Sequence, residues 1–442
     1  MQIQDRLPLF PDTTTISNNA LHIAGHELVS LVEKFGTPLY VYDRTTMDAA
    51  VVRYKAALKA HYPGTAHITY AGKAFLCRAV AKWADQNGLW IDCTGESEIG
   101  AAAAARVPAG GIVVHGVNKS TADLEYAVQH AATVVVDNLD ELQRLTLVLQ
   151  SSKASRKNSP ALESVWLRLQ PGLAVSTHHS HTQTGQSGSK FGMSSEELRQ
   201  AAAEARLAGL PLDGIHFHLG SNFRETSPLV AAIDSALDLA KRLGLDDPWH
   251  FSPGGGWGVA YREDELPNPD LELYVRVIAE TVARRCRQKA LPLPILHIEP
   301  GRSLTARAAV AIYRVGSIKR RKDRNWLLVD GGMADNPRHA LYGAQYSGLP
   351  AVGLGREFNV LVSIGGPCCE SGDVLTEDLM MPALDAGELV VIPVSGAYHL
   401  SMASNYNGAC RPAVVWLEGG RPHLIVRRET SADLHRRDLS LP

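Results

Sequence analysis

The sequence is poor in cysteine, has no long apolar run and carries no excess charge of either sign. Its six cysteines are scattered through 442 residues, which is not the pattern of a disulfide framework. No stretch approaches the roughly 20 apolar residues that span a membrane, and residues 1–15 do not resemble a secretion signal. A net charge of −2 argues against nucleic acid and anionic membranes as partners. We therefore expect a cytoplasmic protein.

Motifs for metal binding are also missing from the sequence. It has no Cys-x-x-Cys pair and no His/Cys cluster with the spacing of a zinc site. His178, His179 and His181 fall in a polar, Gly/Ser-rich stretch, which predicts a surface loop rather than a set of ligands. We expect no bound metal.

Short apolar runs alternate with longer helix-like segments between residues 66 and 302. This alternation is typical of a parallel sheet with crossover helices. Eight such units fit the size of a (β/α)8 barrel. An open doubly wound sheet is the alternative, but no Gly-x-Gly-x-x-Gly motif follows the first strand. The predicted strands are Ala66–Tyr70, Leu89–Cys93, Gly111–His115, Thr133–Val136, Ser164–Leu169, Leu212–His218, Trp249–Ser252 and Ile295–Ile298.

Polar side chains and glycines follow these strands at their carboxyl ends. In a (β/α)8 barrel those ends open on one face, which holds the active site, and phosphate often binds after strands seven and eight. A glycine turn and Gly301-Arg302 occupy those two loops. The residues concerned are Lys73, His115, Arg168, His218, Gly254, Gly255, Gly256, Glu299, Gly301 and Arg302.

The remainder of the chain favours strands over helices. Strand-like runs occur at Leu39–Tyr42 before the barrel and at five places after Ser303. We predict a barrel domain over residues 44–302 and a mostly antiparallel β domain, sandwich-like or barrel-like, built from residues 1–43 and 303–442. The five later strands are Trp326–Asp330, Phe358–Ser363, Glu388–Val394, Ala413–Leu417 and Pro422–Arg428.

Three of these features together suit pyridoxal phosphate. Lys73 supplies an amine for its aldehyde, the turn Gly254–Gly256 supplies an anion cradle for its phosphate, and Glu299 supplies a partner for its ring nitrogen. Taken singly, the glycine turn is more often only a loop. The order of all three along one barrel predicts a pyridoxal phosphate enzyme.

Six motifs in the same order resemble the alanine-racemase-like, fold type III decarboxylases, and within these the diaminopimelate decarboxylases. The resemblance covers nearly the whole chain. It implies a barrel plus a β domain, pyridoxal phosphate, and a head-to-tail homodimer with composite active sites. The motifs are Tyr70-Ala-Gly-Lys-Ala, Gly214-Ile-His-Phe-His-Leu-Gly-Ser221, Pro253-Gly-Gly-Gly256, Glu299-Pro-Gly-Arg302, Cys369-Glu-Ser-Gly-Asp373 and Gly396-Ala-Tyr398.

The resemblance assigns further roles. Lys73 is implied to bond to the cofactor aldehyde and Glu299 to accept from the pyridine nitrogen, while His218 is implied to stack on the ring. Ser221 and Tyr398 are implied to join the glycines around the phosphate. His115 and Arg168 resemble positions beside the ring.

Substrate recognition follows from the same resemblance. Arg302, Arg338 and Tyr342, with Tyr398 nearby, are implied to hold a distal carboxylate, which suits the planar fork of arginine. Glu370 is implied to hold the distal ammonium. Cys369 is implied to reprotonate Cα from the partner subunit, with Asp373 supporting its loop and Cys368 structural.

The reaction expected from this resemblance is decarboxylation of meso-2,6-diaminopimelate to L-lysine, the last step of lysine biosynthesis. Two alternatives remain on the same fold: a decarboxylase of ornithine or arginine, and an amino-acid racemase. Ornithine and arginine lack a distal carboxylate, so neither substrate would give Arg338 a carboxylate to bind. A regulatory relative that binds the cofactor without activity is the alternative from another class.

Overall fold

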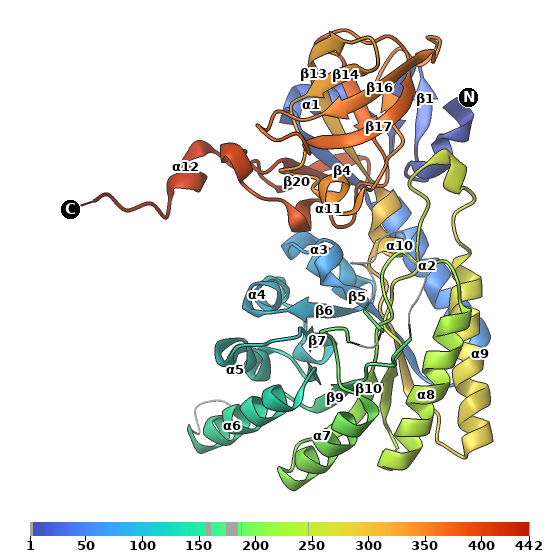
Figure 1. Cartoon of the computed structure of the whole chain (residues 1–442), viewed down its shortest axis with the longest axis vertical. Coiled ribbons are helices and arrows are strands. Elements are labelled where there is room, and N and C mark those ends of the chain that lie inside the picture. The colour runs from blue at the N-terminus through green and yellow to red at the C-terminus, as the bar shows by residue number, and fades with distance from the viewer. Residues whose placement is uncertain (1–2, 156–160, 174–183, 187, 246, 442) are drawn as a thin grey trace. The chain divides into compact units, whose positions relative to one another are not determined.

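The computed structural model describes residues 3–155, 161–173, 184–186, 188–245 and 247–441 (Figure 1). The chain divides into two compact units. The barrel unit comprises residues 51–258 and 270–301, and the β unit comprises residues 1–50, 259–269 and 302–442. The predicted loop with His178, His179 and His181 lies outside the described residues.

Eight parallel strands close the barrel unit into a ring in which β12 pairs with β5. The predicted (β/α)8 barrel is confirmed, and each predicted strand has its counterpart. Strand β10 ends at His216, so His218 lies in the following loop and not at the strand end as predicted. The strands are β5 (Ala66–Ala71), β6 (Trp90–Thr94), β7 (Ile112–His115), β8 (Thr133–Val136), β9 (Ser164–Arg168), β10 (Leu212–His216), β11 (His250–Ser252) and β12 (Ile295–Ile298).

Helices follow the strands around the barrel. Strand β8 is buried along its whole length because a parallel strand inside a ring of helices meets no water on either face. Ser120 and Ser194 begin helices α5 and α7 with capping boxes, which satisfy backbone N–H groups at the helix starts. The helices are α2 (Arg44–His61), α3 (Arg78–Gln86), α4 (Glu96–Ala104), α5 (Thr121–His130), α6 (Leu139–Ser155), α7 (Ser195–Leu207), α8 (Ser227–Leu243) and α9 (Leu271–Lys289).

The β unit is built around a mostly antiparallel sheet with strand order β17-β16-β14-β13-β4-β19-β20, in which β18 pairs with β13 and β15. Strand β4, from the N-terminal segment, lies between β13 and β19. Both ends of the chain therefore build one sheet, as predicted. The strands are β4 (Leu39–Asp43), β13 (Ala309–Arg320), β14 (Asn325–Val329), β15 (Leu349–Pro350), β16 (Val360–Gly365), β17 (Val374–Met381), β18 (Leu389–Ile392), β19 (Ala413–Glu418) and β20 (Arg421–Val426).

Two long strands of this sheet, β13 and β17, were not predicted. Strand β13 begins buried and ends exposed, and its register with β14 shifts between Val315 and Ser317. Such an irregularity breaks the two-residue alternation that reveals a strand in a sequence. The smaller elements of the β unit are β1 (Thr15–Ser17), β2 (Ala20–Ile23), β3 (His26–Glu27), α1 (Leu28–Phe35), α10 (Arg302–Thr305), α11 (Arg338–Tyr342) and α12 (Ser431–His435).

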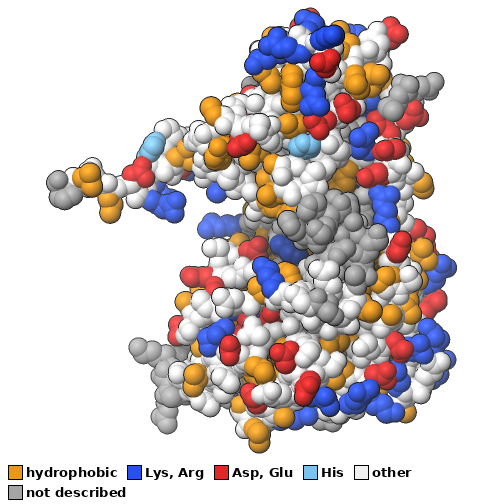
Figure 2. Space-filling model, viewed as in Figure 1, with side chains coloured by type: hydrophobic (Ala, Val, Ile, Leu, Met, Phe, Trp, Pro, Cys, Tyr) orange, Lys and Arg blue, Asp and Glu red, His pale blue; other side chains and the backbone are white. Residues whose placement is uncertain are grey.

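The visible surface of each unit carries both acidic and basic side chains (Figure 2). This mixture agrees with the balanced charge of the sequence. Of the helices in the described part of the chain, none combines the length and the apolar character needed to cross a membrane.

Candidate active site

Lys73 lies in a short turn directly after β5, at the carboxyl end of the barrel strands. Its Nζ atom is 3.1 Å from Oδ2 of Asp92, a buried carboxylate on β6. The lysine side chain is 47% exposed whereas that of Asp92 is 1% exposed, so the amine can be reached from the barrel mouth while its counter-charge stays fixed.

Glu299, directly after β12, is held by donors from two other strands. Nε2 of His216 donates to its Oε2 at 3.1 Å, and Oγ of Ser252 donates to its Oε1 at 2.6 Å. His115 Nε2 lies 3.5 Å from the same Oε1. Burial by itself would raise the pKa of this carboxyl, but His216, His115 and Ser252 hold it well below its usual range. Glu299 is therefore an anion at neutral pH.

Two histidines near Glu299, His115 and His218, are neutral at pH 7. Burial lowers the pKa of His115 to about 4, and burial together with Lys73 and Arg168 lowers that of His218 well below its usual range. His218 Nδ1 accepts from the backbone N–H of Gly255 at 3.3 Å, which leaves its proton on Nε2. His115 Nε2 also lies 4.0 Å from Oδ1 of Asp92, the carboxylate that pairs with Lys73. The His115 ring therefore lies between Asp92 and Glu299.

The glycine turn after β11 packs too closely for any side chain. Gly254 and Gly256 have φ values of +73° and +100°, which glycine adopts readily. A Cβ atom on Gly255 would overlap the carbonyl of Glu299, and one on Gly256 would overlap that of Gly220, next to Ser221. The turn thus lies between Glu299 and the loop after β10, with its backbone unshielded by side chains. Gly301 meets the methyl groups of the Lys73 turn in the same tight way.

The barrel unit therefore brings together Lys73, Glu299, His218, His115, the glycine turn and Gly301. Arg168, at the end of β9, bonds to Asp137 at 3.3 Å and lies over the ring of Phe191. His115, His216 and Glu299 also present three ligand-type atoms within 4.8 Å of one another, a spacing that a metal ion could use. The hydrogen bond between His216 and the carboxylate accounts for part of that spacing without an ion.

Four of the five predicted substrate residues (Arg302, Arg338, Tyr342 and Tyr398) lie together inside the β unit, and Glu370 is the exception. The guanidinium carbon of Arg302 lies 4.7 Å from the ring centre of Tyr398, and that of Arg338 lies 5.6 Å from Tyr342. The ring of Tyr261 lies 5.7 Å from Arg302 and 5.5 Å from Arg338, and its hydroxyl accepts from Arg302. Two buried cations surrounded by aromatic faces form a site for an anion.

Comparison with known proteins agrees with this geometry. The pyridoxal binding domain of pyridoxal-dependent decarboxylases matches residues 48–306. Diaminopimelate decarboxylase of Synechocystis sp. is 38% identical over 97% of this chain and 92% of its own. That of Bacillus subtilis is 38% identical over 95% of both chains. The chain belongs to the diaminopimelate decarboxylase family.

Solved structures of the family show the same fold. Diaminopimelate decarboxylase of M. jannaschii in complex with L-lysine superposes with a TM-score of 0.89 at 28% identity, covering 98% of both chains. The chain is a pyridoxal-dependent decarboxylase, and its cofactor is pyridoxal phosphate, as the sequence predicted. The site fits that cofactor: it offers an amine, an anionic carboxylate and a glycine cradle that a Cβ atom would fill.

Cys369 and Glu370 lie in an exposed loop of the β unit. The N–H of Cys369 donates to Asn407 at 2.8 Å, and Asp373 accepts from the N–H groups of Cys368 and Met333 at 2.6 Å each. Asp373 thus supports the loop. Among the described residues, the contacts found for the side chains of Cys369 and Glu370 do not include Arg302 or Arg338. Exposed positions of this kind are open to another subunit.

Several residues of the site were missed by the sequence prediction. His216 and Ser252 hold Glu299, while Tyr261, Tyr346 and His399 surround the arginines. The spacing of His216, two residues before His218 in one motif, was a signal that could have found it. A lone buried tyrosine or serine leaves no such signal, because it resembles any satisfied core residue.

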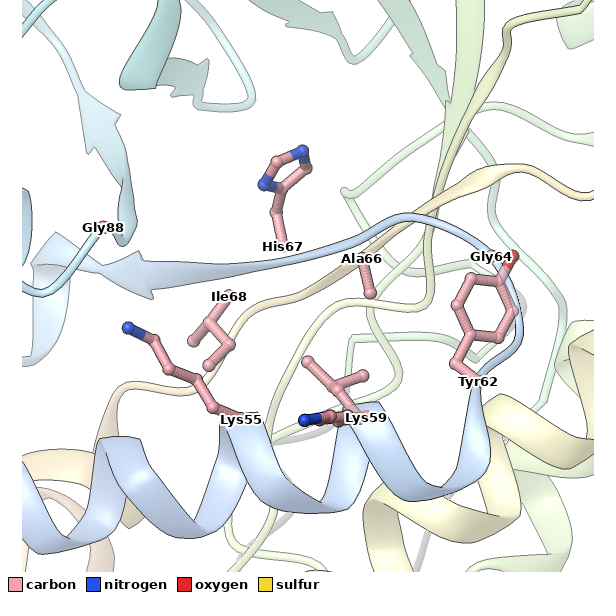
Figure 3. A pocket seen from close by; sticks show the side chains of 9 residues that line it. Lys55, Lys59, Tyr62, Gly64, Ala66, His67, Ile68 and Gly88 are labelled. Atoms are coloured by element: carbon pink, nitrogen blue, oxygen red, sulfur yellow. The ribbon is translucent and has the colours of Figure 1, made fainter.

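A cavity of about 340 Å³ lies elsewhere on the barrel unit, between α2 and the first residues of β5 (Figure 3). Lys55, Lys59 and Ile68 lie between the helix and the strand, whereas His67 points away from the opposite face of the strand (Figure 3). Because the chemistry lies at the carboxyl ends of the strands, this cavity at their amino ends is not the candidate active site.

Proposed function

We propose that this chain decarboxylates meso-2,6-diaminopimelate to L-lysine. The observation that carries the proposal is the buried pair Arg302 and Arg338 in a pyridoxal-dependent decarboxylase. A diamino dicarboxylic acid keeps one carboxylate far from the reacting carbon, and two arginines suit it. Ornithine and arginine carry only the carboxylate that leaves.

Pyridoxal phosphate supplies the electron sink for the pair of electrons left on Cα when carbon dioxide departs. Lys73 presents its amine beside Asp92 at the barrel mouth. The Glu299 carboxylate would accept a hydrogen bond from the ring nitrogen and so keep the proton on that nitrogen. The glycine turn Gly254–Gly256, with Ser221 and Tyr398, would hold the phosphate, and His218 would pack against the ring.

In this proposal, residues of the β unit bind the substrate. Arg302, Arg338 and Tyr342 hold the distal carboxylate, and Glu370 holds the distal ammonium. Cys369 delivers a proton from its thiol to Cα. We place Cys369 and Glu370 in the site of the partner subunit of a homodimer, which agrees with their exposure. We place the enzyme in the cytoplasm, because its six scattered cysteines suit a reducing compartment.

A substrate comparison tests the function. Purified protein loaded with pyridoxal phosphate is incubated separately with meso-2,6-diaminopimelate, ornithine and arginine, and carbon dioxide and amine products are measured. We expect lysine and carbon dioxide from diaminopimelate and a rate at least about a hundredfold lower from the others, because a site built around a polar group rejects ligands that lack it. The Lys73→Ala protein is the control. Faster turnover of ornithine or arginine would overturn the substrate assignment.

A further inference from the structure

A continuous row of buried polar groups runs through the β unit and ends at Arg338. Arg338 Nε lies 3.0 Å from the hydroxyl of Tyr346, which lies 3.0 Å from Nε2 of His399. His399 Nδ1 lies 3.5 Å from the hydroxyl of Tyr40, which lies 2.8 Å from Oδ2 of Asp335. All five side chains are at most 4% exposed, so water does not replace a lost partner.

The chemistry of the groups sets one direction for every hydrogen bond in this row. Arginine can only donate, so the Tyr346 oxygen accepts, and its own hydrogen goes to Nε2 of His399 at 3.0 Å, which is nearer than the other acceptor, Oδ1 of Asn336 at 3.5 Å. Burial, with Arg338 and Arg302, holds the pKa of His399 well below its usual range, so the ring is neutral. Its single proton is then on Nδ1, facing Tyr40.

The row ends on an acceptor. Tyr40 donates to Asp335, and so does Tyr313, whose hydroxyl lies 2.6 Å from the same Oδ2. Burial raises the pKa of Asp335 to about 6, which leaves it a carboxylate at neutral pH. Each donor from Arg338 to Asp335 therefore has an acceptor, and a buried network that is satisfied throughout holds its members rigidly.

This row fixes one edge of the Arg338 guanidinium. Within the described residues, the side-chain hydrogen bond found for Arg338 uses Nε, on the inner edge of the fork. The rings of Tyr261 and Tyr342 lie 5.5 and 5.6 Å from the guanidinium carbon and limit its rotation. A guanidinium held in this way presents its two terminal nitrogens in one orientation, as bidentate binding of a carboxylate requires.

We propose that Tyr346 and His399 are positioning residues that orient Arg338 and so set the preference for substrates with a distal carboxylate. The proposal rests on the proposed function and names the source of its specificity. Neither residue touches the reacting atoms in this proposal. Their loss is expected to weaken binding of the distal carboxylate and to leave the chemical step nearly unchanged.

Four variants test this proposal in the cofactor-loaded enzyme. Tyr346→Phe removes one oxygen from the row, and His399→Leu removes both ring nitrogens. His399→Gln keeps an acceptor where Nε2 lies. Tyr313→Phe is the matched control, because it removes another buried hydroxyl that contacts only the far end of the row, at Asp335 and Tyr40, and has no hydrogen bond to Arg338, Tyr346 or His399 among the described residues. Thermal unfolding and cofactor absorbance show which variants are folded and loaded.

We expect KM for diaminopimelate to rise about tenfold in Tyr346→Phe and His399→Leu, with kcat within about threefold of wild type. In Tyr313→Phe and His399→Gln, KM should change less than about threefold. Inhibition by L-lysine, which keeps the distal carboxylate, should weaken about tenfold in Tyr346→Phe. Inhibition by 1,5-diaminopentane, which has no carboxylate, should not change.

Equal KM values in Tyr346→Phe and Tyr313→Phe would overturn the positioning role, as would a fall in kcat at constant KM. If His399→Leu does not fold, Tyr346→Phe decides the question, because it changes the volume of the core least. Failure of the wild-type enzyme to release lysine from diaminopimelate would reject the proposed function instead.

Discussion

At the residue scale, the candidate site depends on a carboxylate kept anionic inside the barrel. Glu299 is buried, yet donors from β10 and β11 hold its charge in place. Lys73, Glu299 and His218 could be predicted because each lies in a motif whose chemistry is visible in the sequence. His216 and Ser252 were missed, since a residue that acts on another side chain is recognised only when the fold brings the two together.

Replacing His216 tests this arrangement. His216→Phe keeps a ring beside His115, whose centre lies 4.7 Å away, but removes the donor to Glu299. A carboxylate that loses a charge-assisted hydrogen bond holds the ring-nitrogen proton less well, so kcat should fall about tenfold or more with KM little changed. Steady-state kinetics of the loaded enzyme measure this.

The matched control for this variant is His250→Gln, a substitution at the amino end of β11 in the same barrel. It should leave kcat within about twofold of wild type, because the polar partners found for His250 among the described residues are His297 and Asp213 and not Glu299. A kcat for His216→Phe equal to that of the control would refute the role given to His216.

At the scale of elements, the barrel strands were predictable and the β unit less so. Each barrel strand is an apolar run followed by a polar or glycine-rich turn, and burial of parallel strands on both faces makes that run continuous. Strand β13 was not predicted, because its second half is mostly exposed and its register with β14 is irregular. Both features interrupt the regular apolar pattern by which a strand is recognised in a sequence. Local sequence predicts an element best when the whole element has one environment.

The amino ends of the barrel strands enclose histidines whose protonation opposes folding. His250 Nδ1 lies 2.8 Å from His297 Nε2, and burial with His67 lowers the pKa of His250 to about 4. A histidine with a folded pKa below its unfolded value of about 6.5 contributes stability above pH 6.5, and that stability is lost as pH falls toward 4.

The variant His250→Gln should therefore be less sensitive to acid. Between pH 7 and pH 5 the wild-type protein should lose about 2 kcal/mol more of its free energy of unfolding than the variant does. Urea-induced unfolding at the two pH values, followed by tryptophan fluorescence, measures the difference. The same loss in both proteins would show that folding does not lower the pKa of His250.

At the scale of the whole molecule, the homodimer proposed above predicts how variant subunits should behave when they are mixed. Lys73 belongs to the barrel unit and Cys369 to an exposed loop of the β unit. A homodimer with composite sites predicts that two differently damaged subunits can rebuild one intact site between them.

Co-expression of Lys73→Ala and Cys369→Ala subunits tests this assembly. Each variant alone should be nearly inactive, and random pairing should restore about a quarter of wild-type activity, because half of the dimers then hold one intact site of two. Separately tagged subunits confirm that mixed dimers have formed. Activity no higher than the sum of the two parents, with mixed dimers present, would place both residues in the same subunit's site.

The sequence by itself determined the barrel and the cofactor, and it predicted the residues that we propose to meet the cofactor, because all of these depend on runs and motifs that are contiguous in the chain. Only the tertiary structure decided how Glu299 keeps its charge and what orients Arg338. Those contacts join residues far apart in the chain, such as Tyr40 and Asp335, and each of them alone resembles an ordinary core residue. Burial makes the contacts strong, and burial is a property of the folded chain.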